Sequence, residues 1–298
     1  MHWAVRALRW SLLWSSACGW SPQDAAAAPA AATRRSHLVS AGLGAAACLQ
    51  AAASNARCSE DQCIFEKRRT FVRAGRTFVI EQEFNTKQSR STGTGVWECA
   101  EVLSSYLADT APSLAAGQRV LELGAGCGLC SIVAAAAGAQ RVVTTDGDEG
   151  VLRHLEVILD ANTLQPRPET VKLRWEDATA ATAASLGAPF DVILGADVTY
   201  YPGSALSLAN ALVAHASPRT TVLLAHKRRR AEDDQTLATL GEYFEFSTLV
   251  SPKTLQGVTV FALRKRASAP DDLGLGDLGA DNCNPGYARK GNTCILAA

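Results

Sequence analysis

Short apolar runs alternate with amphipathic stretches of helical length between residues 64 and 266. This alternation is typical of an α/β fold built on a largely parallel sheet. Eight runs have the length and composition of strands, at residues 76–82, 119–123, 141–146, 171–175, 190–197, 221–226, 243–249 and 257–265. Four stretches have the periodicity of helices, at residues 96–109, 129–138, 150–162 and 205–216. No helix-length segment separates the last two strands, so we expect them to pair as an antiparallel hairpin.

The two ends of the chain depart from this pattern. Residues 1–59 contain a single acid, Asp24, no lysine and five arginines. Such an acid-poor, arginine-bearing start is typical of organelle transit peptides, so we expect a plastid or mitochondrial location. The alternative is a low-complexity leader without an address on a cytoplasmic protein. Residues 267–298 are rich in glycine, aspartate, proline and asparagine and predict a polar tail, which leaves one folded domain at 64–266.

Composition argues against a membrane and against a nucleic acid as partners. An alanine-rich run follows Arg34 and Arg35, but its uninterrupted apolar part falls short of the about 20 residues that span a bilayer, so we expect no stable membrane insertion. Basic and acidic residues number 29 each, and the resulting net charge of zero argues against a nucleic-acid binder. The basic run at 226–234 passes directly into acids, which favours a solvated helix start over a substrate-facing patch.

The nine cysteines include no pair of C-x-x-C motifs at a zinc-binding spacing, so we expect no metal site. Cys127 and Cys130 do form one C-x-x-C at a predicted helix start, where a thioredoxin-type redox pair is one interpretation. The glycines that flank these cysteines favour a ligand-binding loop instead.

The segment RVLELGAGCGLCS, residues 119–131, is a strand that breaks into glycines and resumes as a helix. Such a turn lets a ligand lie against bare backbone and a helix N-terminus. The spacing is E-x-G-x-G-x-G from Glu122 to Gly128, and Leu129 stands where the dinucleotide fingerprint needs its third glycine. The next strand ends in Asp146, whose carboxylate suits a ribose diol. These residues predict an adenosine cofactor without separating NAD from S-adenosylmethionine.

Six motifs occur in order between about residues 70 and 265: TGTGVWECAEVLSSYL, VLELGAGCGL, TTD, LRWED, FDVILGADVTYY and LLAHKRR. With these motifs the chain resembles the seven-β-strand protein-lysine methyltransferases. The resemblance implies a Rossmann-like, seven-stranded class I methyltransferase sheet with a C-terminal antiparallel hairpin. It also implies S-adenosylmethionine as the cofactor and a lysine side chain of a protein substrate as the acceptor. We expect the enzyme to be a monomer.

The resemblance assigns roles to residues of these motifs. It places Trp97 beside the cofactor, Asp146 on the ribose and Trp175 near the adenine. Glu122, at the strand end before the loop, is expected among the cofactor-binding residues. The other cofactor contacts fall on Gly124, Ala125, Gly126 and Ala196, and the acceptor site falls on Asp197 and Tyr200. Glu176 stands where the family has a glycine after its tryptophan, which puts the adenine contact in doubt.

Methyl transfer from a sulfonium is an in-line displacement that needs alignment and no nucleophilic serine or cysteine. A lysine amine, with a reference pKa of about 10.4, must first lose its proton. We expect Asp197 to orient the amine and Tyr200 to provide an aromatic wall for the cationic partners. A histidine or small-molecule acceptor and a non-catalytic cofactor-binding module stay open as alternatives. An NAD-dependent oxidoreductase is disfavoured by Leu129 and the C-terminal hairpin.

Overall fold

A computed structural model describes the following parts of the chain: residues 66–83, 91–252, 257–275, 287–290 and 293–296. Every described residue belongs to one compact unit within residues 58–298. The leader expected at residues 1–59 lies outside the described residues, so its targeting role stays a prediction.

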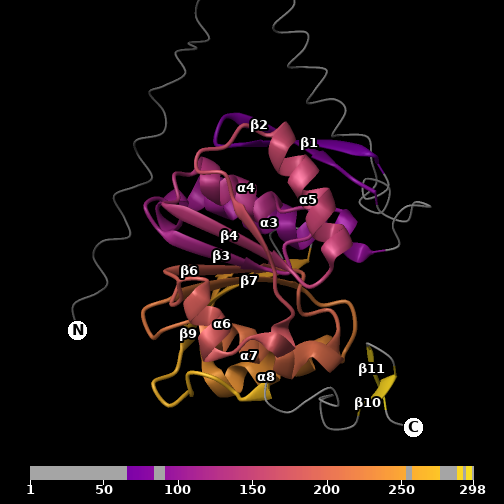
Figure 1. The fold of residues 1–298 in the computed structure, drawn as a ribbon, viewed down its shortest axis with the longest axis vertical. Helices are drawn as coiled ribbons and strands as arrows, with labels where there is room; N and C mark the ends of the chain where they lie inside the picture. The colour runs from indigo at the N-terminus through magenta and orange to yellow at the C-terminus, as the bar shows by residue number, and fades with distance from the viewer. Residues whose placement is uncertain (1–65, 84–90, 253–256, 276–286, 291–292, 297–298) are drawn as a thin grey trace, which may run out of the picture. The chain divides into compact units, whose positions relative to one another are not determined.

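A seven-stranded sheet forms the centre of the described unit, in the order β5-β4-β3-β6-β7-β9-β8 (Figure 1). Its five parallel strands are β3 (Arg119–Leu123), β4 (Arg141–Asp146), β5 (Glu169–Lys172), β6 (Val192–Ala196) and β7 (Thr221–Lys227). The last two strands, β8 (Phe244–Val250) and β9 (Val258–Lys265), pair antiparallel, and β9 also runs antiparallel to β7. The expected Rossmann-like sheet and its C-terminal hairpin are thereby confirmed.

The parallel strands are continuous apolar runs because both faces of the sheet are covered. Successive side chains of one strand enter opposite cores, as the pleat requires. Val120 packs into the core on one face and Leu121 into the core on the other, and Leu223 and Leu224 divide in the same way. The sheet is therefore the middle of three layers.

Helices make the two outer layers (Figure 1). One face carries α3 (Glu98–Ser105), α4 (Leu129–Ala136) and α5 (Glu149–Ala161), and the other carries α6 (Ala180–Ser185), α7 (Ala205–His215) and α8 (Asp233–Tyr243). Short turns complete these elements: the 3₁₀ turns Thr92–Thr94, Pro112–Leu114, Trp175–Asp177 and Pro202–Ser204, and the π turn Tyr106–Thr110. The predicted helix over 96–109 is thus α-helical only to Ser105.

One predicted strand lies outside the central sheet. The run at 76–82 forms β2 (Arg76–Glu81), which pairs antiparallel with β1 (Arg68–Arg73) in a separate hairpin. Phe78 and Ile80 alternate along β2 and pack into the core that also contains α3, α4 and α5. Alternation alone shows that one face of a strand is buried and does not identify its partner.

The polar tail predicted from residue 267 begins against the domain. The buried Lys265, the last residue of β9, donates a hydrogen bond to Asp271 Oδ1 of this tail at 3.0 Å. The backbone N–H of Leu273 donates to Asn210 Oδ1 at 3.2 Å. Further along, β10 (Tyr287–Lys290) and β11 (Thr293–Leu296) pair as a small antiparallel hairpin.

Candidate active site

A cleft of about 420 Å³ opens at the carboxyl ends of β3, β4 and β6. The chain leaves β3 toward β4 on one side, while β6 pairs with β3 on the other. Such a topological switch point is where open α/β sheets bind their ligands. Nine of the ten residues predicted for the site line this cleft: Trp97, Gly124, Ala125, Gly126, Asp146, Trp175, Ala196, Asp197 and Tyr200.

The floor of the cleft is the glycine loop between β3 and α4. Gly126 has a φ of +54°, and a Cβ atom built on it would lie 2.8 Å from the carbonyl oxygen of Gly93. The N–H of Gly126 donates to Asp146 Oδ2 at 3.1 Å. Only glycine combines this left-handed backbone with so close an approach to the 91–95 segment. The loop therefore leaves its backbone open to a ligand.

Gly126→Ala is expected to weaken S-adenosylmethionine binding about tenfold. The new Cβ would strain the left-handed backbone of residue 126 and push away the carbonyl group of Gly93, and both residues line the cleft. The matched control is Gly117→Ala. Gly117 has a φ of +72°, but a Cβ there would meet nothing within 4 Å. Calorimetry should show normal cofactor affinity for the control, although both variants lose about 1–2 kcal/mol of stability. Equal affinities in the two variants would contradict the role of the close approach.

Asp146 lies beside the glycine loop at the end of β4. Its Oδ1 accepts the N–H of Asp148 at 3.0 Å, and its Oδ2 accepts that of Gly126. Burial raises the pKa of the Asp146 carboxyl, while these backbone hydrogen bonds oppose the rise. A carboxylate has about four acceptor sites, so both oxygens retain capacity for a ribose diol.

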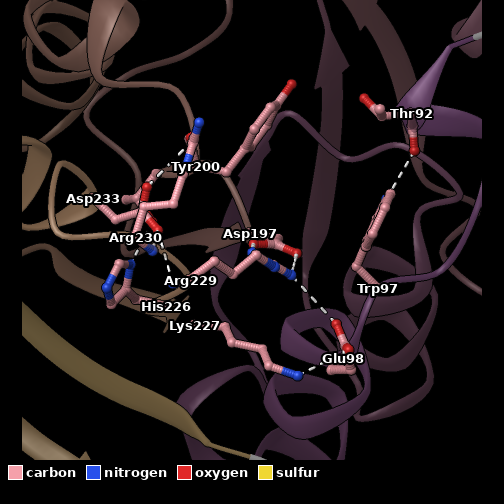
Figure 2. A network of polar contacts seen from close by, with 11 residues as sticks. Thr92, Trp97, Glu98, Asp197, Tyr200, His226, Lys227, Arg229, Arg230 and Asp233 are labelled. Atoms are coloured by element: carbon pink, nitrogen blue, oxygen red, sulfur yellow. Dashed lines mark hydrogen bonds and ion pairs between the residues drawn. The ribbon is translucent and has the colours of Figure 1, made fainter. Parts of the chain in front are cut away.

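Two tryptophans make walls of the cleft. Trp97 precedes α3, and its indole N–H donates to the carbonyl oxygen of Thr92 at 2.8 Å (Figure 2). The ring of Trp175 lies so close to Gly124 that a Cβ there would come within 3.1 Å of it. Glu176, the departure from the family pattern, also lines the cleft and accepts a hydrogen bond from Arg174 Nε at 2.9 Å. The substitution therefore adds an ion pair at this rim and leaves Trp175 in the cleft.

Glu122 is the one predicted site residue that does not line the cleft. Its carboxyl group is buried beneath the loop, where it accepts hydrogen bonds from the backbone N–H of Ser131 at 2.8 Å and from the Ser131 hydroxyl. Its backbone carbonyl accepts the hydroxyl of Thr145. The residue thus ties the start of α4 to β3, and its contact with the loop is indirect.

Glu122→Gln is expected to change how stability depends on pH. Burial raises the pKa of Glu122 from 4.5 to about 7, so the folded protein binds more protons than the unfolded chain within this window. The free energy of unfolding therefore falls as pH rises through it. Urea unfolding should show that the variant gains about 2 kcal/mol relative to the wild type between pH 5 and pH 8. Parallel pH profiles for the two proteins would show that Glu122 does not titrate in this window.

Asp197 directly follows β6 and has a left-handed backbone, with a φ of +59°. Figure 2 shows its carboxylate paired with Arg229, with the ring of Tyr200 above it and Trp97 to one side. Arg229 binds both carboxylate oxygens, with Nη1–Oδ1 and Nη2–Oδ2 distances of 2.6 and 2.7 Å. The hydrogen bonds that the Arg229 guanidinium donates to Asp197 raise the pKa of Arg229. The negative charge of Asp197 is therefore compensated by Arg229. Tyr200 is 46% exposed and lies at the rim of the cleft.

Arg229 belongs to a cluster that the sequence does not predict. Glu98 of α3 accepts hydrogen bonds from Arg229 Nη2 at 3.3 Å and from Lys227 Nζ at 2.9 Å (Figure 2). The run at 226–234 does precede a helix, because α8 begins at Asp233. Its interpretation as a wholly solvated start is wrong for Arg229, which turns inward to Asp197. The length of the run could have indicated an inward-facing base, since four successive basic residues cannot all pair with the three acids that follow them at 232–234.

Other chemistries find little support among the described residues. Cys127 and Cys130 are buried free thiols, and burial raises the pKa of both, whereas a redox pair needs a lowered pKa. Within the described ranges no group of three or more His, Cys, Asp or Glu residues has the geometry of a metal site. Among the described residues, no helix is long and apolar enough to cross a bilayer.

Comparison with known proteins places the chain among methyltransferases. The sequence profile of the family described as Lysine methyltransferase matches residues 78–242. Protein N-lysine methyltransferase METTL21A of Mus musculus is 32% identical over 206 residues, which cover 68% of this chain and 89% of that protein. Protein-lysine N-methyltransferase EFM3 of Chaetomium thermophilum is 31% identical over 170 residues, 53% of this chain and 49% of that protein. Histone-arginine methyltransferase METTL23 of Mus musculus is 35% identical over 141 residues, 47% of this chain and 54% of that protein.

Proposed function

This chain belongs to the lysine methyltransferase family, and on that premise we propose that its cleft presents a lysine amine of a protein substrate between Trp97 and Tyr200. The enzyme is an S-adenosylmethionine-dependent protein-lysine methyltransferase. The observation that carries the acceptor proposal is the carboxylate of Asp197, which lines the cleft together with Trp97 and Tyr200 (Figure 2).

The residues of the cleft fit the cofactor. The loop around Gly126 leaves room that a Cβ would fill, Asp146 has acceptor sites for two hydroxyl groups, and Trp175 offers an aromatic face. When bound, S-adenosylmethionine supplies an electrophilic methyl group on a positively charged sulfur. The chain's own residues have the remaining tasks of orienting the acceptor and limiting its contact with water.

The acceptor subsite suits a lysine better than an arginine. A guanidinium is best held by a carboxylate with two free oxygens in a planar, bidentate pair. Asp197 already makes that pair with Arg229, so it has single lone pairs left to offer. A single-atom donor such as a lysine amine fits this geometry. The aromatic rings of Trp97 and Tyr200 give the alkyl chain of that lysine an apolar passage.

The test is transfer of labelled methyl groups from S-adenosylmethionine to an extract of cells that lack this protein. We expect label on a protein, and mass spectrometry should locate it on a lysine Nζ. Label on arginine, on histidine or in the low-molecular-weight fraction would overturn the proposed acceptor, and no transfer above a protein-free control would favour a non-catalytic module. We further propose that the enzyme acts as a monomer, which light scattering on the purified protein would check.

A further inference from the structure

Arg229 is a fixed part of the cleft mouth. It reaches Asp197 from the loop between β7 and α8. The side chain of Arg229 is 31% exposed and that of Asp197 is 8% exposed. The guanidinium also lies 5.7 Å from the ring centroid of Trp97, where a cation–π contact adds to the ion pair. Charge-assisted bidentate pairs that are partly shielded from water are among the stronger polar contacts in proteins.

The backbone of Arg229 is also held. The buried Asp233, at the start of α8, accepts the N–H groups of Arg229 and Arg230 at 2.8 and 2.9 Å. The side chain of Arg230 in turn donates to the carbonyl oxygen of Tyr200 at 2.5 Å. The basic loop and the loop that carries Asp197 are thus bound to each other at two points, which fixes the guanidinium relative to the acceptor subsite.

The charges at this end of the cleft balance. Asp197 and Glu98 are paired with Arg229 and Lys227, two acids with two bases. The titratable groups near Asp197 are Cys99 of α3, His226 of β7, Arg229 of the loop after β7 and Tyr200 of its own loop. Glu98 and Lys227 join this cluster through Arg229. Burial lowers the pKa of His226 and raises that of Cys99, so both are neutral near pH 7.

This balance matters because the acceptor must react as a free amine. An unpaired carboxylate within about 4–6 Å of an amine raises its pKa by one to three units and so favours the unreactive ammonium. We propose that Arg229 is a positioning residue that neutralises Asp197, so that this carboxylate accepts a hydrogen bond from the uncharged acceptor amine without stabilising its ammonium form. The amine's proton passes to water before transfer. The nitrogen lone pair then forms the N–C bond to the methyl group while the C–S bond of the sulfonium breaks, and the electron pair of that bond stays on the sulfur of the departing neutral thioether. The inference rests on the proposed lysine acceptor.

The first test is the pH dependence of methyl transfer to the labelled protein of the extract. Arg229→Gln removes the charge and should move the half-maximal pH upward by about one unit. Arg229→Lys keeps a positive charge, so its half-maximal pH should lie close to that of the wild type. Arg228→Gln is the matched control, because Arg228 is 58% exposed and pairs with Asp234; its profile should match the wild type. A lower rate with an unmoved profile in Arg229→Gln would reduce Arg229 to a structural role and overturn the proposal.

The second test needs no protein acceptor. The probe is n-butylamine, which has the alkyl amine of a lysine side chain, added to protein saturated with S-adenosylhomocysteine and followed by calorimetry from pH 7 to pH 10.5. Wild-type protein should bind it more tightly as pH rises, because it takes the neutral amine. Arg229→Gln should instead bind it more tightly at pH 7, as the ammonium. The same pH trend in both proteins would overturn the proposal.

The two proposals fail in different ways. If the labelled-methyl assay finds an acceptor other than lysine, the proposed function fails whatever n-butylamine does. If lysine is methylated but Arg229→Gln shifts neither profile, only the inference about Arg229 fails. The double variant Asp197→Asn with Arg229→Gln removes both charges, so its profile should return to the wild-type pH even though its rate is low. S-adenosylhomocysteine affinity shows that each variant is folded.

Discussion

Asp197→Asn is expected to slow methyl transfer by about 10²-fold or more while affinity for S-adenosylmethionine changes little. Asparagine tolerates the left-handed backbone of this position better than most residues, so the variant should keep the shape of the loop. It loses the charge that fixes Arg229, and its amide NH₂ group faces one of the guanidinium N–H donors. The acceptor then loses its orienting group, while the glycine loop and Asp146 are unaffected.

Asp191→Asn is the matched control for this variant. Asp191 lies just before the opposite end of the same strand, β6, and also pairs with an arginine, Arg119, at 3.1 and 3.2 Å. The control should therefore retain both cofactor binding and turnover. Two results for Asp197→Asn would break the assignment. Loss of S-adenosylmethionine binding would make Asp197 a cofactor ligand, and undiminished turnover on the labelled protein would place the acceptor elsewhere.

Asp146→Ala is expected to weaken S-adenosylmethionine binding by about 1.5–3 kcal/mol, which is roughly a 10- to 150-fold rise in Kd. The variant removes the acceptors for a ribose diol and also releases the N–H of Gly126, so part of the loss comes from a looser glycine loop. The fold should persist, because Asp146 is the last residue of β4 and its side chain is not part of either apolar core.

Asp146→Asn provides the graded comparison for this prediction. Its amide retains one acceptor oxygen, so calorimetry should place its affinity between those of the wild type and Asp146→Ala. Unchanged affinity in both variants would remove Asp146 from the cofactor site. A loss of thermal stability that matches the loss of affinity would instead assign the effect to the loop.

The sequence determines the sheet and the cofactor side of the site because both depend on local signals. Apolar runs separated by helical stretches predict all seven strands of the sheet, including the antiparallel pair after β7. The glycines of residues 124–128 directly follow β3, and Asp146 ends the adjacent parallel strand β4, so they meet at one edge of the sheet. Residues that follow such strands converge whatever the details of packing. The family resemblance supplies the other predicted positions, such as Trp97, which follows no strand of the sheet. Nine of the ten predicted site residues line the cleft.

The tertiary structure alone decides which charged side chains face the cleft and which partners they bind. Glu122 precedes the glycine loop in sequence, but the pleat turns its side chain under α4 and away from the cleft. The strand over 76–82 is joined to β1 by the two-residue turn at Ala74 and Gly75, but only packing decides that its apolar side chains enter the core of α3, α4 and α5 instead of joining the central sheet. Arg229 lies 32 residues from Asp197 and is one of several adjacent arginines, so no local pattern singles it out. Its pairing, and with it the charge offered to the acceptor, follows from the packing of α3 and the 228–232 loop against the end of β6.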